Sequence, residues 1–197
     1  MSDFIAKIVS LVSSPSLIII PLTYGVIFKS TSNITYSLRW TFISMFFVFL
    51  AGLFILYGVV KGYYSNFDIS KREQRGSIFA FAIALTIIYM MVIVIFKGPN
   101  SILLSLLGFL LGIAVISAVN TKVKASIHLA VFSSVSVALG ILYGGVFWAL
   151  LILAPLVAWS RIRLKKHILS ETIIGAVLGT LLVLFLYYVV TYTYGAR

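Results

Sequence analysis

Long apolar segments separated by short polar connections dominate this sequence and leave few folds open to it. Residues 125–159 contain no charged side chain apart from His128. As one helix this segment would be about 52 Å long at ~1.5 Å per residue, whereas the hydrocarbon core of a bilayer is about 30 Å thick. We therefore expect it to fold back on itself, with the break at the YGG sequence of residues 143–145.

The overall composition agrees with a chain that resides in a membrane. Hydrophobic residues make up 62% of the 197 positions, only 10% are charged, and the mean hydropathy is +1.17. Strands of an outer-membrane barrel would be about half as long as these segments and would alternate in polarity. The lack of cysteine excludes disulfides, thiolate metal sites and cysteine nucleophiles. These observations predict an integral membrane protein built from helices.

We predict an all-α, polytopic membrane helix bundle of about seven (six to seven) transmembrane helices, forming a single transmembrane domain over residues 1–197. Pro15 and Pro21 are candidate kinks in the first span, which lacks the basic region and cleavage site of a removable signal peptide. The spans are expected at residues 4–28, 36–60, 78–96, 102–119, 125–143, 146–159 and 167–192.

The basic residues gather in the connections between these spans. In the predicted topology the connections 61–76, 120–125 and 160–167 share one membrane face. A net charge of +11 confined to short connections favours anionic headgroups or a phosphate-bearing substrate over nucleic acid. The positive-inside rule predicts that this face of a cell-membrane protein is cytoplasmic, but the excess becomes slight without the candidates for phosphate binding. Ten of the fifteen lysines and arginines lie in these connections: Lys61, Lys71, Arg72, Arg75, Lys122, Lys124, Arg161, Arg163, Lys165 and Lys166.

His167 and Glu171 are the most informative pair of polar residues. They are four positions apart, so on a helix they share one face. The carboxylate can accept a hydrogen bond from one ring nitrogen, which leaves the other nitrogen as a nucleophile or base. The alternative is an ordinary surface pair at a helix start, where an acid also suits the helix dipole. A polar pair at a membrane edge is costly and favours the functional interpretation.

The start of the fifth span carries a second cluster of donors. Lys124, Ser126 and His128 lie at a helix N-terminus, where amides and the helix dipole attract anions. Ser160 and Arg161 offer similar donors in the third connection. An interfacial histidine satisfied by water or a carbonyl is the alternative for His128.

The first connection contributes further positive charge through Lys71, Arg72 and Arg75. If this stretch is helical, the two arginines share a face; alternatively, the loop only sets topology or touches acidic lipids. Together the three connections suit phosphoryl transfer, in which cationic donors hold the nonbridging oxygens. Carboxylates are too scarce for a magnesium cage, so we predict neither a metal nor another cofactor.

The third connection resembles a motif of the type-2 phosphatidate phosphatase superfamily, which comprises membrane lipid phosphatases related to bacterial acid phosphatases and vanadium haloperoxidases. The family's third motif is serine-arginine, five residues, histidine, three residues, aspartate. Here it is Ser160 and Arg161, IRLKK, His167, ILS and Glu171, with glutamate in place of aspartate. The small residues of GAVLG at 175–179 also resemble the family's helix after that motif.

The other two family motifs match only in part. Proline-serine-glycine-histidine corresponds to Ala125, Ser126, Ile127 and His128. In the first motif, lysine, six residues, arginine-proline, Arg75 stands for the arginine, and the lysine and proline positions hold Asp68 and Gly76. Arg72, Lys71 or Lys124 are candidates to supply the missing charge. The motif-bearing resemblance covers residues 68–180.

The resemblance implies a metal-independent lipid phosphate or diphosphate phosphatase acting through a phosphohistidine. His167 would attack phosphorus, Glu171 would hold its ring, and His128 would protonate the leaving oxygen and then activate water. The phosphoryl group would be bound by these residues: Arg161, Arg75, Arg72, Lys71, Lys124, Ser126 and Ser160.

A membrane lipid, of the phosphatidate or isoprenoid diphosphate type, is the expected substrate. The alternative is a non-catalytic member that binds anionic lipid or a partner protein, which the changes in the first two motifs favour and the retained histidines oppose. A transporter would require ionisable residues in the middle of spans, and almost none occur there. The sequence does not indicate an oligomeric state.

Overall fold

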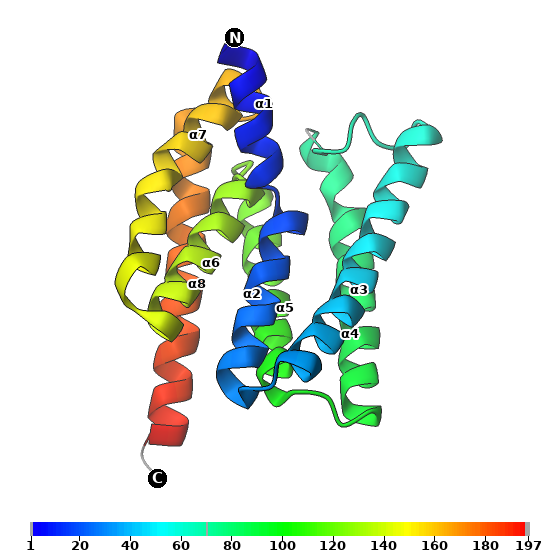
Figure 1. The fold of residues 1–197 in the computed structure, drawn as a ribbon. Helices are drawn as coiled ribbons and strands as arrows, with labels where there is room; N and C mark the ends of the chain where they lie inside the picture. The colour runs from blue at the N-terminus through cyan, green and yellow to red at the C-terminus, as the bar shows by residue number, and fades with distance from the viewer. Residues whose placement is uncertain (1, 70, 196–197) are drawn as a thin grey trace. The chain divides into compact units, whose positions relative to one another are not determined.

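The computed structural model describes residues 2–69 and 71–195, and these residues form helices and no strand. Most of these elements are α-helices (Figure 1), and two are 3₁₀ helices. The all-α prediction is therefore confirmed. In chain order the elements are α1 (Ser2–Val12), α2 (Pro15–Thr31), α3 (Ile34–Val60), η1 (Arg72–Gln74), α4 (Arg75–Ile95), α5 (Asn100–Asn120), α6 (Ile127–Tyr143), η2 (Gly145–Leu153), α7 (Ala154–Arg163) and α8 (Leu169–Gly195).

Several of these helices are long and apolar enough to cross a membrane, as expected for a multi-pass membrane protein. Within the described residues there are five such spans, and α1 with α2 makes a sixth if that bent pair counts as one. The remaining predicted span, α6, is apolar but has only 17 residues. The five are Ile34–Val60, Arg72–Ile95, Asn100–Asn120, Gly145–Arg163 and Leu169–Tyr192.

The structure has a bend next to Pro15 and a reversal at residues 143–145, as expected from the sequence. The helix axis bends by 41° between α1 and α2, and Pro15 is the first residue of α2. Pro21 lies inside α2, which continues through it. The predicted reversal at residues 143–145 occurs at Gly144 and Gly145, whose φ angles of 66° and 52° favour glycine.

The chain divides into two compact units: residues 1–22 with 122–197, and residues 23–121. In the second unit, α3, α4 and α5 pack around an apolar cluster of Ile27, Trp40, Tyr89, Ile93 and Ile102. The hydroxyls of Ser44 and Tyr89 are 2.6 Å apart within this unit, so that two buried polar groups satisfy each other.

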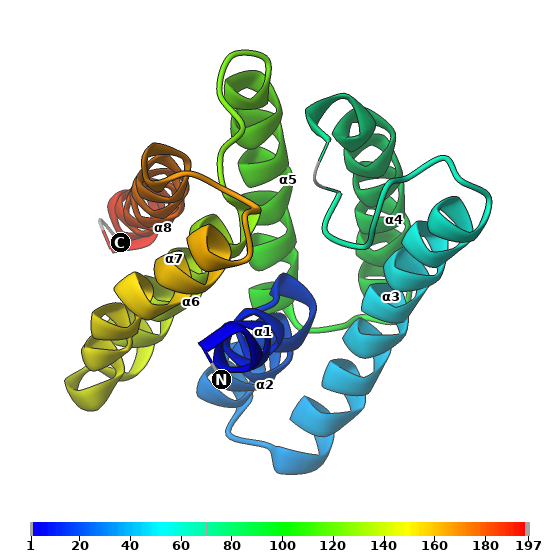
Figure 2. The same ribbon diagram turned by 90° about the horizontal axis from the view of Figure 1, so that it is seen from above.

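The first unit is built on the close packing of α6 against α8, which lie side by side in Figures 1 and 2. A Cβ atom at Gly175 would collide with the carbonyl oxygen of Ser126, and one at Gly179 with that of Ala130. The hydroxyl of Ser134 donates to the carbonyl of Gly179 at 3.0 Å. Two glycines four residues apart thus allow the backbones to approach, as is common in membrane helix pairs. This contact brings the starts of α6 and α8 together.

Candidate active site

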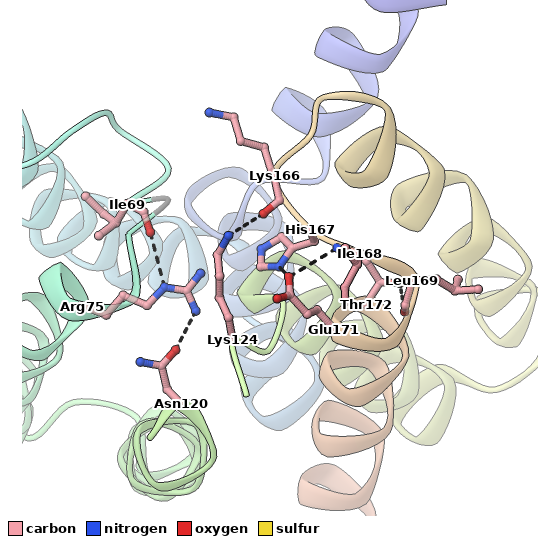
Figure 3. Close-up of polar contacts among 10 residues, drawn as sticks. All are labelled: Ile69, Arg75, Asn120, Lys124, Lys166, His167, Ile168, Leu169, Glu171 and Thr172. Carbon is pink, nitrogen blue, oxygen red and sulfur yellow. Dashed lines mark hydrogen bonds and ion pairs between the residues drawn. The ribbon is translucent and has the colours of Figure 1, made fainter. Parts of the chain in front are cut away.

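His167 and Glu171 form a buried pair at the start of α8. The Nδ1 atom of His167 is 2.7 Å from Oε2 of Glu171, and the two side chains are only 4% and 17% exposed (Figure 3). Because a carboxylate only accepts hydrogen bonds, Nδ1 carries the proton in this contact. The lone pair of a neutral ring is then on Nε2.

The backbone between α7 and α8 explains how His167 is placed. Lys165 has a φ of 54°, in the left-handed region, directly after the last turn of α7. Its amide donates to the carbonyl of Ile162 at 2.9 Å, and the amide of Lys166 donates to that of Arg161 at 3.0 Å. This pair of bonds is a Schellman cap, which ends α7 and turns the chain. The amide of His167 also donates to the Arg161 carbonyl, at 3.3 Å.

Glu171 also caps the helix that it begins. Its Oε2 accepts the backbone amide of Ile168, immediately before α8, at 3.4 Å. A glutamate at the third helical position often reaches back to the N-cap amide in this way. One carboxylate therefore fixes both the His167 ring and the first turn of α8.

The start of α6 is joined directly to this turn. The amide of Ser126, the N-cap residue of α6, donates to the carbonyl of Glu171 at 3.0 Å. The Ser126 side chain is fully buried, and among the described residues no hydrogen-bond partner reaches its Oγ. His128 is half-buried in the first turn of α6. An unpartnered buried hydroxyl at a helix N-terminus is an arrangement that suits an anion.

Lys124 binds the connection that carries His167. Its Nζ donates to the backbone carbonyl of Lys166 at 2.6 Å (Figure 3). An ammonium has three donors, and this bond holds its charge at the start of α6 next to the α7–α8 connection. The sequence alone could not reveal this contact, since its acceptor is a backbone atom.

Ser160 and Arg161 are both buried near the end of α7, but their polar groups differ in role. The hydroxyl of Ser160 donates to the carbonyl of Val157 in its own helix at 2.7 Å. The guanidinium of Arg161, 2% exposed, donates from its Nη1 to the hydroxyl of Ser10 in α1. Ser10 was not predicted as part of the site.

The three basic candidates of the first connection belong to the second unit. Arg75 begins α4 and is 2% exposed, whereas Lys71 and Arg72 are exposed. The Nη1 of Arg75 donates to Oδ1 of Asn120 at 3.1 Å, and its Nε to the carbonyl of Ile69 at 3.4 Å (Figure 3). Arg75 is thus an oriented, buried cation, as an anion-binding arginine would be.

The possible metal ligands of the chain do not gather at one place. Within the described ranges, no group of three or more histidine, aspartate or glutamate side chains is placed to hold a metal ion. The acid beside His167 is engaged by its ring.

Comparison with known proteins finds one match, in the part of the chain that contains both histidines. A family model described as the PAP2 superfamily matches residues 120–194. This match supports membership in the PAP2 superfamily. It includes His128, His167 and Glu171, and it ends one residue before the end of α8. No curated protein and no solved structure matches the chain.

The matched range covers less than half of the chain, and several described helices are long and apolar enough to cross a membrane. Residues 2–119 lie outside the matched range, and they include Arg75, Arg72 and Lys71 as well as Ser10. Ser10 could have been suspected from one pattern, because Ala6, Ser10 and Ser13 are small residues at helical spacing.

Proposed function

We propose that this chain is a metal-independent membrane phosphatase that hydrolyses a phosphomonoester or diphosphate of a lipid through a phosphohistidine on His167. The observation that carries the proposal is the 2.7 Å contact of His167 Nδ1 with Glu171 in a nearly closed environment. A ring held in this way presents Nε2 as the nucleophile, and it gains stabilisation from the carboxylate as positive charge develops on attack.

In the first step, Nε2 of His167 attacks phosphorus and the bond from phosphorus to the lipid oxygen breaks. The protonated His128 ring gives its proton to the leaving oxygen, so a neutral alcohol departs. With a diphosphate, attack is on the terminal phosphorus, the bond to the bridging oxygen breaks, and the protonated lipid monophosphate departs. In the second step, neutral His128 takes a proton from water, the oxygen attacks phosphorus, and the phosphorus–nitrogen bond breaks. Inorganic phosphate leaves, and both histidines return to their starting states.

The phosphoryl oxygens need cations and amide donors in both steps. Arg161 and Lys124 supply charge from the same unit as His167, and Ser126 supplies a hydroxyl together with the N-terminal amides of α6. From the sequence alone, Arg75, Arg72 and Lys71 of the second unit are further candidates for binding phosphate, and Ser160 lies next to Arg161 as an acceptor.

A lipid substrate agrees with the position of the site. The site residues lie at the ends of apolar helices, and the described chain has little polar surface beyond its short connections. A phosphatidate-type lipid or an isoprenoid diphosphate would keep its tail in the bilayer and present its phosphate there. The basic connections favour a site on the cytoplasmic side of the cell membrane.

The test is phosphate release by the full chain in detergent with EDTA present. Phosphatidate, phosphatidylglycerol phosphate and isoprenoid diphosphates serve as substrates, and His167→Ala is compared with the unchanged protein. We expect release that survives EDTA and is lost in His167→Ala, with unfolding temperature retained. Folded protein that releases phosphate from none of them would instead favour a non-catalytic role in binding anionic lipid or a partner protein.

A further inference from the structure

Helix α1 packs along α7 through one face made of small residues. Ala6, Ser10 and Ser13 are all buried, and they follow one another at spacings of four and three residues. Large apolar side chains elsewhere on α1 are exposed, with Phe4 at 68% and Leu11 at 64%. A small-residue face of this kind allows two membrane helices to approach closely (Figure 1).

Three polar contacts connect this helix to α7, and in one of them Nη2 of Arg163 donates to the hydroxyl of Ser2 at 3.1 Å. At its start, Asp3 lies 2.7 Å from Nε of Arg163, in a solvent-exposed pair whose side chains are 68% and 50% exposed. Further along, the hydroxyl of Ser10 accepts Nη1 of the buried Arg161. Exposed ion pairs contribute little to stability, whereas hydrogen bonds to buried charged groups contribute more.

We propose that Ser10 is a positioning residue for the phosphate site, because it sets the direction of the Arg161 guanidinium. This inference rests on the proposed function, in which Arg161 binds the phosphoryl oxygens. A guanidinium is planar with five N–H donors in a fixed arrangement. Fixing Nη1 to an atom of another helix therefore also fixes the directions of the remaining donors. Helix α1, which lies outside the range matched by the family model, thereby contributes to the phosphate site.

Ser13, the residue directly after the end of α1, provides a matched control. It is also buried, at 4% exposed, but its hydroxyl donates to the carbonyl of Val9 at 2.7 Å and lies 3.5 Å from the carbonyl oxygen of Ser10. Ser13→Ala therefore removes a buried hydroxyl next to α1 without removing a contact to Arg161. Any general effect of such a change on helix packing is measured by this variant.

The experiment uses the full chain in detergent and orthovanadate as a phosphate analogue. Its dissociation constant is obtained from the rise in unfolding temperature with vanadate concentration, and its inhibition constant from turnover of the best substrate. Neither constant depends on the fraction of protein that is active, so a loss of folded protein alone leaves both unchanged. We expect Ser10→Ala to weaken vanadate binding about tenfold, the scale of a lost bond to a charged group, and Ser13→Ala to leave it unchanged.

Two further variants protect the test against misfolding. Ser10→Thr keeps the hydroxyl and should restore most of the affinity, whereas Ser10→Cys keeps the size but has a poor acceptor and should resemble Ser10→Ala. Equal vanadate constants in Ser10→Ala, Ser10→Cys and Ser13→Ala would overturn the inference even if the unchanged protein is an active phosphatase.

The two proposals fail in different ways. Vanadate binding that depends on Ser10, without any turnover that depends on His167, would contradict the proposed function and retain the role of Ser10. A protein that shows no vanadate binding and no turnover would overturn both.

Discussion

Replacing Glu171 by glutamine tests the central pair of the site with a change of almost no volume. Oε2 of Glu171 lies 2.7 Å from Nδ1 of His167, and both side chains are largely buried, so water replaces the lost interaction poorly. Hydrogen bonds to charged groups contribute about 1.5–3 kcal/mol, and about 1.4 kcal/mol corresponds to a tenfold change in rate. We therefore expect kcat/KM to fall by about 10- to 150-fold.

The assay compares three variants under identical conditions with the best substrate. Glu171→Asp restores the residue of the family motif and keeps the negative charge, so it should retain more activity than Glu171→Gln. Glu73→Gln removes a carboxylate from an exposed position of η1 and should leave kcat/KM unchanged. If Glu171→Gln keeps kcat/KM within about threefold of the unchanged protein, the carboxylate does not support the nucleophile and the argument from its geometry is refuted.

Two further predictions concern other parts of the first unit. His128→Ala should lose far more activity toward an alkyl phosphate than toward p-nitrophenyl phosphate, whose leaving group needs no proton; equal losses in a steady-state comparison would contradict its role as the acid. Gly179→Ala should lower the free energy of unfolding by about 1–3 kcal/mol, and the unfolding temperature by several degrees, because the new Cβ would meet a carbonyl of α6. Gly76→Ala should change neither, because a Cβ at that position has open space. Equal melting curves for the two variants would refute the close-packing argument.

The sequence was sufficient for features that depend on neighbouring residues. The helices follow from apolar length. The contact of His167 with Glu171 was also expected, but His167 lies in the connection two residues before α8 and not on the same helix as Glu171. The reversal near Gly144 follows from glycines at a position that needs positive φ. Each of these features is decided within a few turns of chain, where spacing and residue type are enough.

Contacts between distant segments could not be predicted in the same way. Lys124 was expected near the phosphate, but its partner is the carbonyl of Lys166, which any residue type would provide. Ser160 was expected to serve as a donor, and in the structure its proton is given to Val157. The bond from Arg161 to Ser10 joins residues far apart in the sequence, and it exists only because α1 packs on α7.

The change from glycine to Ile127 in the second motif bears on whether the site can act. A glycine is required at such a position if the backbone must adopt a left-handed conformation or if a side chain would occupy the space of the ligand. Ile127 is the first residue of α6 and has no positive φ, so its amide takes its direction from the helix itself. The N-terminal amides of α6 therefore do not need glycine to face an anion. Only the volume of the isoleucine side chain remains as a restriction, which would select among substrates by shape without removing the donors that phosphate needs.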